Sequence, residues 1–192
     1  MHPFSVCVYC GSRPGELPAY AEAARTVGTE IGRRGWQLVY GGGRAGLMGE
    51  VADAALAAGA QVIGVIPESL MGRELGHRGL TELHVVQTMH ERKTMMAERS
   101  DAFMALPGGI GTFEELFEVW TWRQLGYHVK PLGLLNVAGY YDALLGFLAH
   151  SREHGFMTTA QTELLHVGDD PAALLQHLVE LAPQVSGDYR RT

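Results

Sequence analysis

The sequence predicts a doubly wound α/β fold, in which one parallel sheet carries helices on both faces. The first observation is that short apolar runs alternate with longer segments of helical spacing. The second is that several of these runs contain no polar residue, which is typical of parallel strands buried on both sides. The third is that glycine-rich turns directly follow two of the runs. Because ligands of such folds bind beyond the carboxyl ends of the strands, we expect the functional site at these turns.

The N-terminal part predicts two strand–helix units. Residues 4–9 form an apolar run that ends in a Gly-Ser turn, so they predict a strand. Residues 18–34 have apolar side chains at helical spacing, and a glycine suited to a helix C-cap follows them. Residues 36–40 are the next apolar run, and residues 47–58 are an alanine-rich helical segment that another glycine ends. The first glycine-rich turn therefore lies between a strand and a helix.

The central part continues the alternation after one irregular segment. Residues 60–66 predict a third strand, which a proline stops. Residues 68–79 have no clean period and contain three glycines, so we expect a loop with at most one helical turn. Residues 83–86 predict a strand, residues 89–99 a helix, and residues 102–106 a strand that leads into the second glycine-rich turn.

The C-terminal part completes the pattern. Helical spacing covers residues 112–125, and residues 131–137 form another apolar run. Residues 140–150 predict a helix, residues 164–167 a last strand, and residues 171–181 a last helix. Each predicted helix can then cross over the sheet between two parallel strands.

Length and composition predict a single domain over residues 1–182, followed by a polar, frayed tail at 183–192. The hydrophobic content of 46% is ample for a core without disulfides. The formal net charge of −6 argues against a nucleic-acid backbone or an anionic membrane as partner. No apolar run has the roughly 18 residues of a membrane span, and no leader peptide is recognisable. We therefore expect a cytoplasmic protein.

Two cysteines, Cys7 and Cys10, have the spacing of a thioredoxin-type redox pair. That pair usually lies at a helix start, whereas these residues straddle the end of an apolar strand. Buried free thiols are the preferred interpretation. The nine histidines show no spacing typical of metal ligands, so we expect no metal and no other cofactor.

The first glycine-rich turn covers residues 41–49, including Gly42 and Gly43. Glycines allow a ligand close to the backbone, and the N–H groups of a helix start attract an anion. The turn also fits the dinucleotide fingerprint G-x-G-x-x-G, but the following strand ends in Val-Ile-Pro without the acidic residue that a dinucleotide site requires. The alternative to a ligand-binding role is that these glycines only allow the helix to pack tightly on the sheet.

The second turn, Pro-Gly-Gly-Ile-Gly-Thr at residues 107–112, again lies between a strand and a helix. Thr112 is a suitable N-cap, and Thr112 to Glu115 fit a capping box, in which Glu115 would only bond back to the Thr112 N–H. Spacing alone does not choose between that role and a role in ligand binding. If the two glycine turns converge at one edge of the sheet, their N–H groups suit a single phosphate. Neither turn contains a lysine or a P-loop sequence, which argues against a nucleoside triphosphatase.

Residues 107–115 resemble the P-G-G-x-G-T-x-x-E signature of the LONELY GUY family of cytokinin riboside 5′-monophosphate phosphoribohydrolases. The resemblance extends over roughly residues 6–148 and includes Met-His-Glu-Arg-Lys at 89–93 and Gly-Tyr-Tyr at 139–141. It implies a modified Rossmann fold, a homodimer and an adenosine-type nucleoside 5′-monophosphate as substrate. The family's catalytic arginine and glutamate correspond to Arg92 and Glu115. Substrate binding is expected at Gly42, Gly43, Glu74, Lys93, Gly109, Ile110, Gly111, Thr112, Phe113, Glu114 and Thr121.

Cleavage of an N-glycosidic bond builds positive charge on the ribose, as at other glycosidic centres. A carboxylate such as Glu115 can stabilise that charge and orient water, and its neighbour Glu114 is the local competitor. Arg92 can neutralise the phosphate or the departing base. Without the resemblance, Arg92 would be interpreted as an ordinary solvated arginine on its helix.

Two other functions stay open at this point. Relatives of this kind have been labelled lysine decarboxylases, but pyridoxal phosphate needs a Schiff-base lysine, and Lys93 and Lys130, the only lysines, lie in no recognisable cofactor motif. The other alternative is a sensor that binds AMP without cleaving it. Turnover separates this sensor from a hydrolase.

Overall fold

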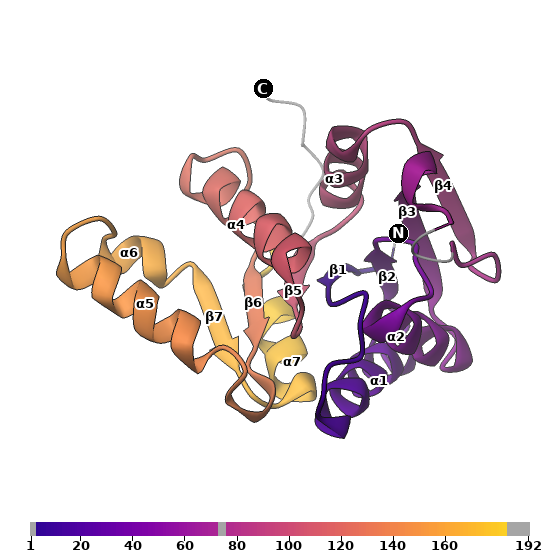
Figure 1. Cartoon of the computed structure of the whole chain (residues 1–192), viewed down its shortest axis with the longest axis horizontal. Coiled ribbons are helices and arrows are strands. Elements are labelled where there is room, and N and C mark those ends of the chain that lie inside the picture. The colour runs from indigo at the N-terminus through magenta and orange to yellow at the C-terminus, as the bar shows by residue number, and fades with distance from the viewer. Residues whose placement is uncertain (1–2, 73–75, 184–192) are drawn as a thin grey trace.

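The computed structural model describes residues 3–72 and 76–183 and contains one seven-stranded sheet. All strand pairs are parallel, in the order β4-β3-β2-β1-β5-β6-β7 (Figure 1). The strands are β1 Ser5–Tyr9, β2 Gln37–Tyr40, β3 Gln61–Pro67, β4 Glu82–Val86, β5 Ala102–Ala105, β6 Leu132–Leu135 and β7 Leu165–Gly168. The fold class predicted from the sequence is confirmed.

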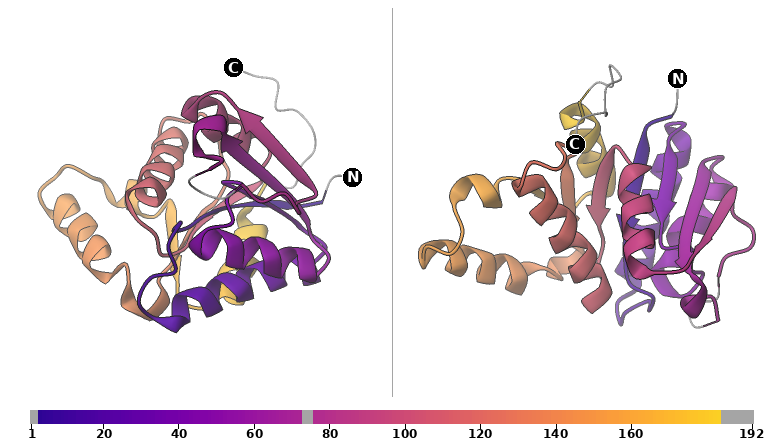
Figure 2. Two further views of the ribbon diagram at one scale, coloured as in Figure 1. Left: turned by 45° about the vertical axis from the view of Figure 1, so that its right-hand side comes forward. Right: turned by 90° about the horizontal axis from the view of Figure 1, so that it is seen from above.

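Helices cover both faces of this sheet (Figures 1 and 2). They are α1 Pro18–Arg33, α2 Gly46–Ala57, α3 Met89–Glu98, α4 Ile110–Gln124, α5 Asp142–Glu153, α6 Thr159–Thr162 and α7 Pro171–Leu181. The side chains of β1 alternate between two cores: Val6 and Val8 pack with α1, α2 and α7, whereas Cys7 and Tyr9 pack with α3 and α4. This alternation follows from the two-residue period of a strand, and it gives each face its own apolar layer.

Two helix starts and one short helix differ from the prediction. Helix α4 begins at Ile110, two residues earlier than expected. A 3₁₀ turn at Val137–Gly139 precedes α5, so that helix begins at Asp142 instead of residue 140. The short helix α6 was not predicted, because four residues are too few to show a period. The expected single turn in the 68–79 loop is the 3₁₀ helix Glu68–Leu70, while Glu74 and the tail from 184 lie outside the described residues.

The strand order places a topological switch at the centre of the sheet. From β1 the chain adds β2, β3 and β4 on one side, then returns to add β5, β6 and β7 on the other. The loops that leave β1 and β5 therefore run in opposite directions, and a crevice opens beyond the carboxyl ends of these two strands. Within the described ranges, no helix is long and apolar enough to cross a membrane.

Helices α1 and α2 cross closely because glycines lie at their contact. A Cβ atom at Gly28 would stand 2.3 Å from the Val51 carbonyl oxygen of α2. We expect Gly28→Ala to lower the free energy of unfolding by about 1–3 kcal/mol, although alanine is the better helix former. The matched control is Gly146→Ala in α5, where no described atom lies within 4 Å of the added Cβ. That variant should gain about 0.5–1 kcal/mol in urea unfolding; the same sign for both variants would contradict the packing described here.

Candidate active site

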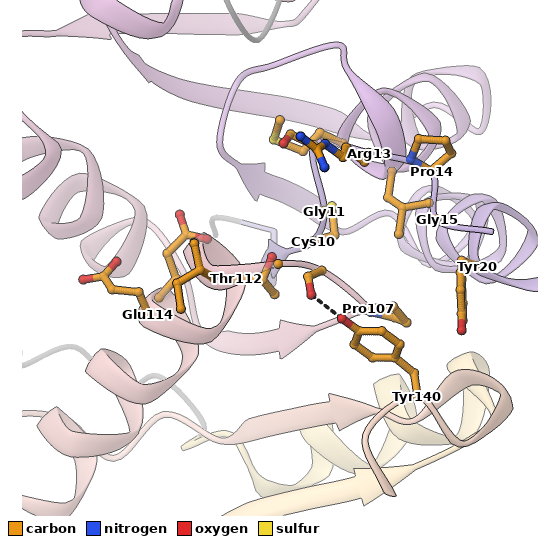
Figure 3. A pocket seen from close by; sticks show the side chains of 18 of the residues that line it. Cys10, Gly11, Arg13, Pro14, Gly15, Tyr20, Pro107, Thr112, Glu114 and Tyr140 are labelled. Atoms are coloured by element: carbon orange, nitrogen blue, oxygen red, sulfur yellow. Dashed lines mark hydrogen bonds between the residues drawn. The ribbon is translucent and has the colours of Figure 1, made fainter. Parts of the chain in front are cut away.

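A cavity of about 610 Å³ opens at the switch point of the sheet (Figure 3). Its walls come from the turn after β1, the turn after β5 with the start of α4, and side chains of α2, α3 and the segment after β6. In Figure 3, Arg13 and Pro14 lie across the cavity from Thr112 and Glu114. The lining residues are Cys10, Gly11, Ser12, Arg13, Pro14, Gly15, Tyr20, Leu47, Met48, Leu70, Met89, Arg92, Pro107, Gly108, Gly109, Ile110, Gly111, Thr112, Glu114, Glu115 and Tyr140.

The start of α4 is built to receive an anion. Gly109 is the N-cap, and the first N–H groups of a helix have no partner within the helix. A Cβ atom at Gly109 or Gly111 would have no described atom within 4 Å, and neither residue has a positive φ. The protein itself therefore gives no steric reason for glycine at these two positions. Open space beside exposed N–H groups and the positive end of the helix dipole suits a phosphate.

The capping box considered for Thr112 and Glu115 is not formed, because α4 begins earlier. Thr112 is the third residue inside α4 and is buried, so it cannot be the N-cap. The helix starts earlier because Gly109 adopts the extended conformation of an N-cap, a position where glycine is accepted. Glu115 consequently lies in the second turn of α4 and lines the cavity. A Thr-x-x-Glu capping box does exist, at Thr88 and Glu91 of α3.

Arg92 is buried, with only 5% of its surface exposed, and is not the solvated arginine that the spacing alone suggested. Its Nε donates to the Val65 carbonyl at 3.1 Å and its Nη2 to the Gly41 carbonyl at 2.9 Å. A Cβ atom at Gly41 would lie 2.1 Å from Nη2, so a larger residue there would displace the guanidinium. These contacts hold a positive charge in a fixed orientation at the cavity wall.

Lys93 joins α3 to α4 through two carboxylates of α4. Its Nζ lies 2.6 Å from Glu114 Oε1 and 3.0 Å from Glu118 Oε1. Burial alone would lower the pKa of Lys93, but the two carboxylates outweigh it and the pKa is raised. Lys93 is thus a charged partner of two glutamates, and it is not among the described residues that line the cavity.

The first glycine turn does not form the expected joint cradle with the second. Gly42 has a φ of 75° and packs against β3, and its carbonyl accepts the His77 N–H. Gly43 pairs with Gly76 in an isolated bridge. Only Leu47 and Met48 of the 41–49 segment line the cavity. Gly42 and Gly43 therefore fit the alternative in which the glycines serve close packing, since their neighbours are protein atoms.

The turn after β1, instead of the first glycine-rich turn, lies beside the turn at residues 107–112. The Gly11 N–H donates to the Pro107 carbonyl at 3.0 Å, and the Leu47 N–H donates to the Gly11 carbonyl at 3.0 Å. A Gly-Ser turn after the first strand was visible in the sequence. The sequence did not reveal that this turn lies beside Pro107, because the reversal of strand order is a property of the whole sheet. Arg13 and Tyr140 were missed for the same reason.

Three further predicted residues are not part of the described cavity wall. Phe113 is half-buried in the core beneath α4, with its ring edge-on to Tyr141 at 6.3 Å. Thr121 is exposed two turns further along α4, and its hydroxyl donates to the Phe117 carbonyl at 2.7 Å. Glu74 lies outside the described residues, so its place relative to the cavity is not described.

The two cysteines are buried thiols that form no disulfide, as expected from the sequence. Burial raises the pKa of the Cys7 thiol to about 12, which is the opposite of the activation that redox chemistry needs. Among the described residues, no group of three or more His, Cys, Asp or Glu side chains is arranged to hold a metal ion.

Fold and cavity together define a class of protein. The crevice lies where Rossmann-like proteins bind nucleotides, its volume is in the usual range for small-molecule sites, and one of its walls is a helix start of the kind that suits an anion. The protein therefore belongs among the Rossmann-like proteins whose site suits a phosphorylated small molecule.

Comparison with known proteins identifies the family. The family described as "Possible lysine decarboxylase" matches residues 48–178. The chain is 54% identical to a cytokinin riboside 5′-monophosphate phosphoribohydrolase of Rhodococcoides fascians, over 82% of this chain and 80% of the relative. It is 51% identical to a probable enzyme of that name from Oryza sativa subsp. japonica, over 93% and 78%. For one cytokinin riboside 5′-monophosphate phosphoribohydrolase of Arabidopsis thaliana the identity is 49%, over 93% of this chain and 83% of the relative. The chain belongs to this family, the LONELY GUY family of the resemblance.

More distant solved structures share the fold. The molybdenum cofactor binding protein from Rippkaea orientalis superposes with a TM-score of 0.72 at 20% identity, covering 94% of this chain and 98% of that one. The molybdenum cofactor carrier protein from Chlamydomonas reinhardtii gives 0.69 at 22% identity, with the same coverage. At these identities the similarity concerns the fold alone.

The ion pairs of Lys93 should contribute measurably to stability. Because its side chain is only 11% exposed, Lys93→Met leaves two carboxylates without their partner, and we expect the free energy of unfolding to fall by about 1–3 kcal/mol. Arg25→Met, which breaks an ion pair whose side chains are 49% and 38% exposed, is the matched control and should cost less than about 1 kcal/mol. Urea unfolding of both variants measures the difference, and equal losses would show that burial does not strengthen the Lys93 pairs.

Proposed function

We propose that this protein hydrolyses the N-glycosidic bond of adenosine-type nucleoside 5′-monophosphates, to a free base and ribose 5-phosphate. The substrate class comprises cytokinin riboside 5′-monophosphates, as the relatives' names state, and extends to AMP. The observation that carries the proposal is the shared cavity, where Glu115 and the fixed guanidinium of Arg92 lie beside the open start of α4.

The proposed chemistry follows from the charges around the cavity. The 5′-phosphate binds the N–H groups at Gly109 to Thr112, which carry the positive end of the α4 dipole. As the bond between C1′ and the base nitrogen breaks, positive charge grows on the ribose, and the Glu115 carboxylate stabilises it. Water then adds its oxygen to C1′ and loses a proton, while the base leaves with a proton on its nitrogen. Arg92 neutralises the negative charge that the departing base acquires.

The other predicted binding residues differ in how directly we expect them to act on the substrate. Ile110, Gly111 and Glu114 contact substrate directly, because they line the cavity. Glu74 lies outside the described residues, and its contact with substrate is proposed from the resemblance alone. For Lys93 we propose a supporting part, since it is paired with Glu114, which lines the cavity. For Gly42, Gly43, Phe113 and Thr121 the proposed part in binding rests on the resemblance alone, since the contacts described for them are with residues outside the cavity wall.

A homodimer is proposed on the exposed apolar side chains of α5. This helix projects from the β7 edge of the sheet and buries only Leu148 (Figure 2). Phe147 is 63% exposed on α5, and Phe156 is 84% exposed just after it. Side chains of this size gain substantially from burial against a second copy.

The dimer predicts a change of mass in solution. Phe147→Glu combined with Phe156→Glu should convert the protein to a monomer in sedimentation velocity, because two carboxylates would enter an apolar interface. Leu181→Glu is the control, since Leu181 is 42% exposed but lies at the end of α7 on the opposite face. A wild-type monomer, or a double variant that stays dimeric, would refute this interface.

The decarboxylase suggested by the family description does not fit the residues present. Lys93 is bonded to two glutamates, and its raised pKa keeps the amine protonated and unreactive. Lys130 donates to the Ala97 carbonyl at 2.7 Å and is not among the described residues of the cavity wall. Neither lysine is placed to form a Schiff base with pyridoxal phosphate at this site.

Turnover distinguishes the hydrolase from an AMP sensor. Incubation with AMP and with isopentenyladenine riboside 5′-monophosphate should release ribose 5-phosphate. Glu115→Gln should lower kcat by about 10²–10⁴-fold, because the amide cannot supply the negative charge. Glu114→Gln is the matched control: it changes a binding contact at the cavity wall and the ion pair with Lys93, so KM should rise while kcat stays within about tenfold.

Arg92 needs a more conservative change than alanine, because its removal would leave two buried carbonyls without donors. Arg92→Lys keeps the charge but loses the fixed geometry, so kcat should fall while near-UV circular dichroism stays native. Wild-type protein that binds AMP but leaves it intact would refute the hydrolase and favour the sensor.

A further inference from the structure

Three successive carbonyl groups after β5 are each held by a donor from another segment. The Tyr141 hydroxyl donates to the Leu106 carbonyl at 2.6 Å, and the Gly11 N–H donates to the Pro107 carbonyl at 3.0 Å. The Tyr140 hydroxyl donates to the Gly108 carbonyl at 2.5 Å (Figure 3). The backbone that enters α4 is therefore fixed through its oxygen atoms.

The bond from Tyr140 also determines where one N–H group points. The Gly108 carbonyl and the Gly109 N–H belong to the same planar trans peptide, so they point in opposite directions. A donor on the oxygen thus directs the N–H away from Tyr140. This control matters between two glycines, since no Cβ restricts the rotation of their peptide. Gly109 is the N-cap of α4, so its N–H belongs to the group of donors at the helix start.

Tyr140 is itself held firmly in position. The preceding turn has two successive left-handed residues, Ala138 with φ 50° and Gly139 with φ 72°. This conformation costs about 1–2 kcal/mol for alanine, and such strain is concentrated at functional sites. The Tyr140 ring stands edge-on to Tyr141 at 4.8 Å and to Tyr20 at 5.7 Å. It is nevertheless 38% exposed and lines the cavity, so it is not a core residue.

We propose that Tyr140 is a positioning residue that makes the site selective for the phosphate group of its substrate. Its hydroxyl orients the Gly108–Gly109 peptide so that the Gly109 N–H donates into the cavity. The inference rests on the proposed function only in placing the 5′-phosphate at the start of α4. Tyr140 contacts the backbone behind the phosphate and acts through it.

Tyr140→Phe tests this role, because it removes one oxygen and keeps the ring contacts that support the fold. The affinity for AMP and for ribose 5-phosphate, measured by calorimetry, should fall about tenfold, the factor that about 1.4 kcal/mol gives. The affinity for adenosine, which lacks the phosphate, should stay unchanged. In turnover, KM for AMP should rise by a similar factor while kcat changes less than about twofold.

Tyr141→Phe is a matched control within the same turn. Its hydroxyl holds the Leu106 carbonyl, whose peptide ends at Pro107 and has no N–H to orient. This variant should lose thermal stability but keep the wild-type ratio of AMP to adenosine affinity. A purely structural role of Tyr140 would lower both affinities together, and that result, or an unchanged affinity for AMP, would overturn the inference. Binding of ribose 5-phosphate and of adenosine is read without turnover, so a failure of the proposed hydrolysis would be seen separately.

Discussion

The pairing of β1 with β5 is the contact on which the rest of the site depends. It continues past β5 through two backbone hydrogen bonds, from the Leu106 N–H to the Tyr9 carbonyl and from the Gly11 N–H to the Pro107 carbonyl. The approach is so close that a Cβ atom at Gly108 would lie 2.1 Å from the Thr112 hydroxyl and 2.9 Å from the Gly11 nitrogen. The turns after the two strands are thereby joined, and the start of α4 opens beside the first turn. Glu115 of α4 lines the cavity beside these joined turns, and so does Tyr140, whose hydroxyl donates to the Gly108 carbonyl.

Arg92 shows how the same fold presents a charge. An arginine taken out of water is destabilising unless its donors are bonded. Here the ends of β2 and β3 supply two carbonyl acceptors, and Gly41 leaves room for the guanidinium. The first glycine turn therefore acts on the site through Arg92. A preoriented cation needs little reorganisation when negative charge develops on a leaving group, which is the main advantage of such an arrangement in catalysis.

The sequence predicted the fold well and the site in part, and the difference is physical. The strands and helices were readable because each has its own period and its own terminating residues, such as the glycines that end α1 and α2. The start of α4 was misplaced because Gly109 and Thr112 both suit an N-cap, and local sequence does not decide between them. The contact of Gly11 with Pro107 depends on strand order, which no local pattern encodes. The Lys93 pairs likewise require the packing of α3 against α4.

The two neighbouring glutamates of α4 show how packing separates residues that the sequence presents as equals. They lie about 100° apart around the helix. Glu114 is 49% exposed and its charge is balanced by Lys93. Glu115 is half-buried in the cavity wall, and its charge contributes, after burial and Cys7, to the raised pKa of Tyr9 in β1. A carboxylate beside the switch point acts on a ligand with less screening by water than one at the rim. The environment thus favours Glu115 for stabilising the ribose cation, whereas Glu114 joins two helices at the mouth of the cavity.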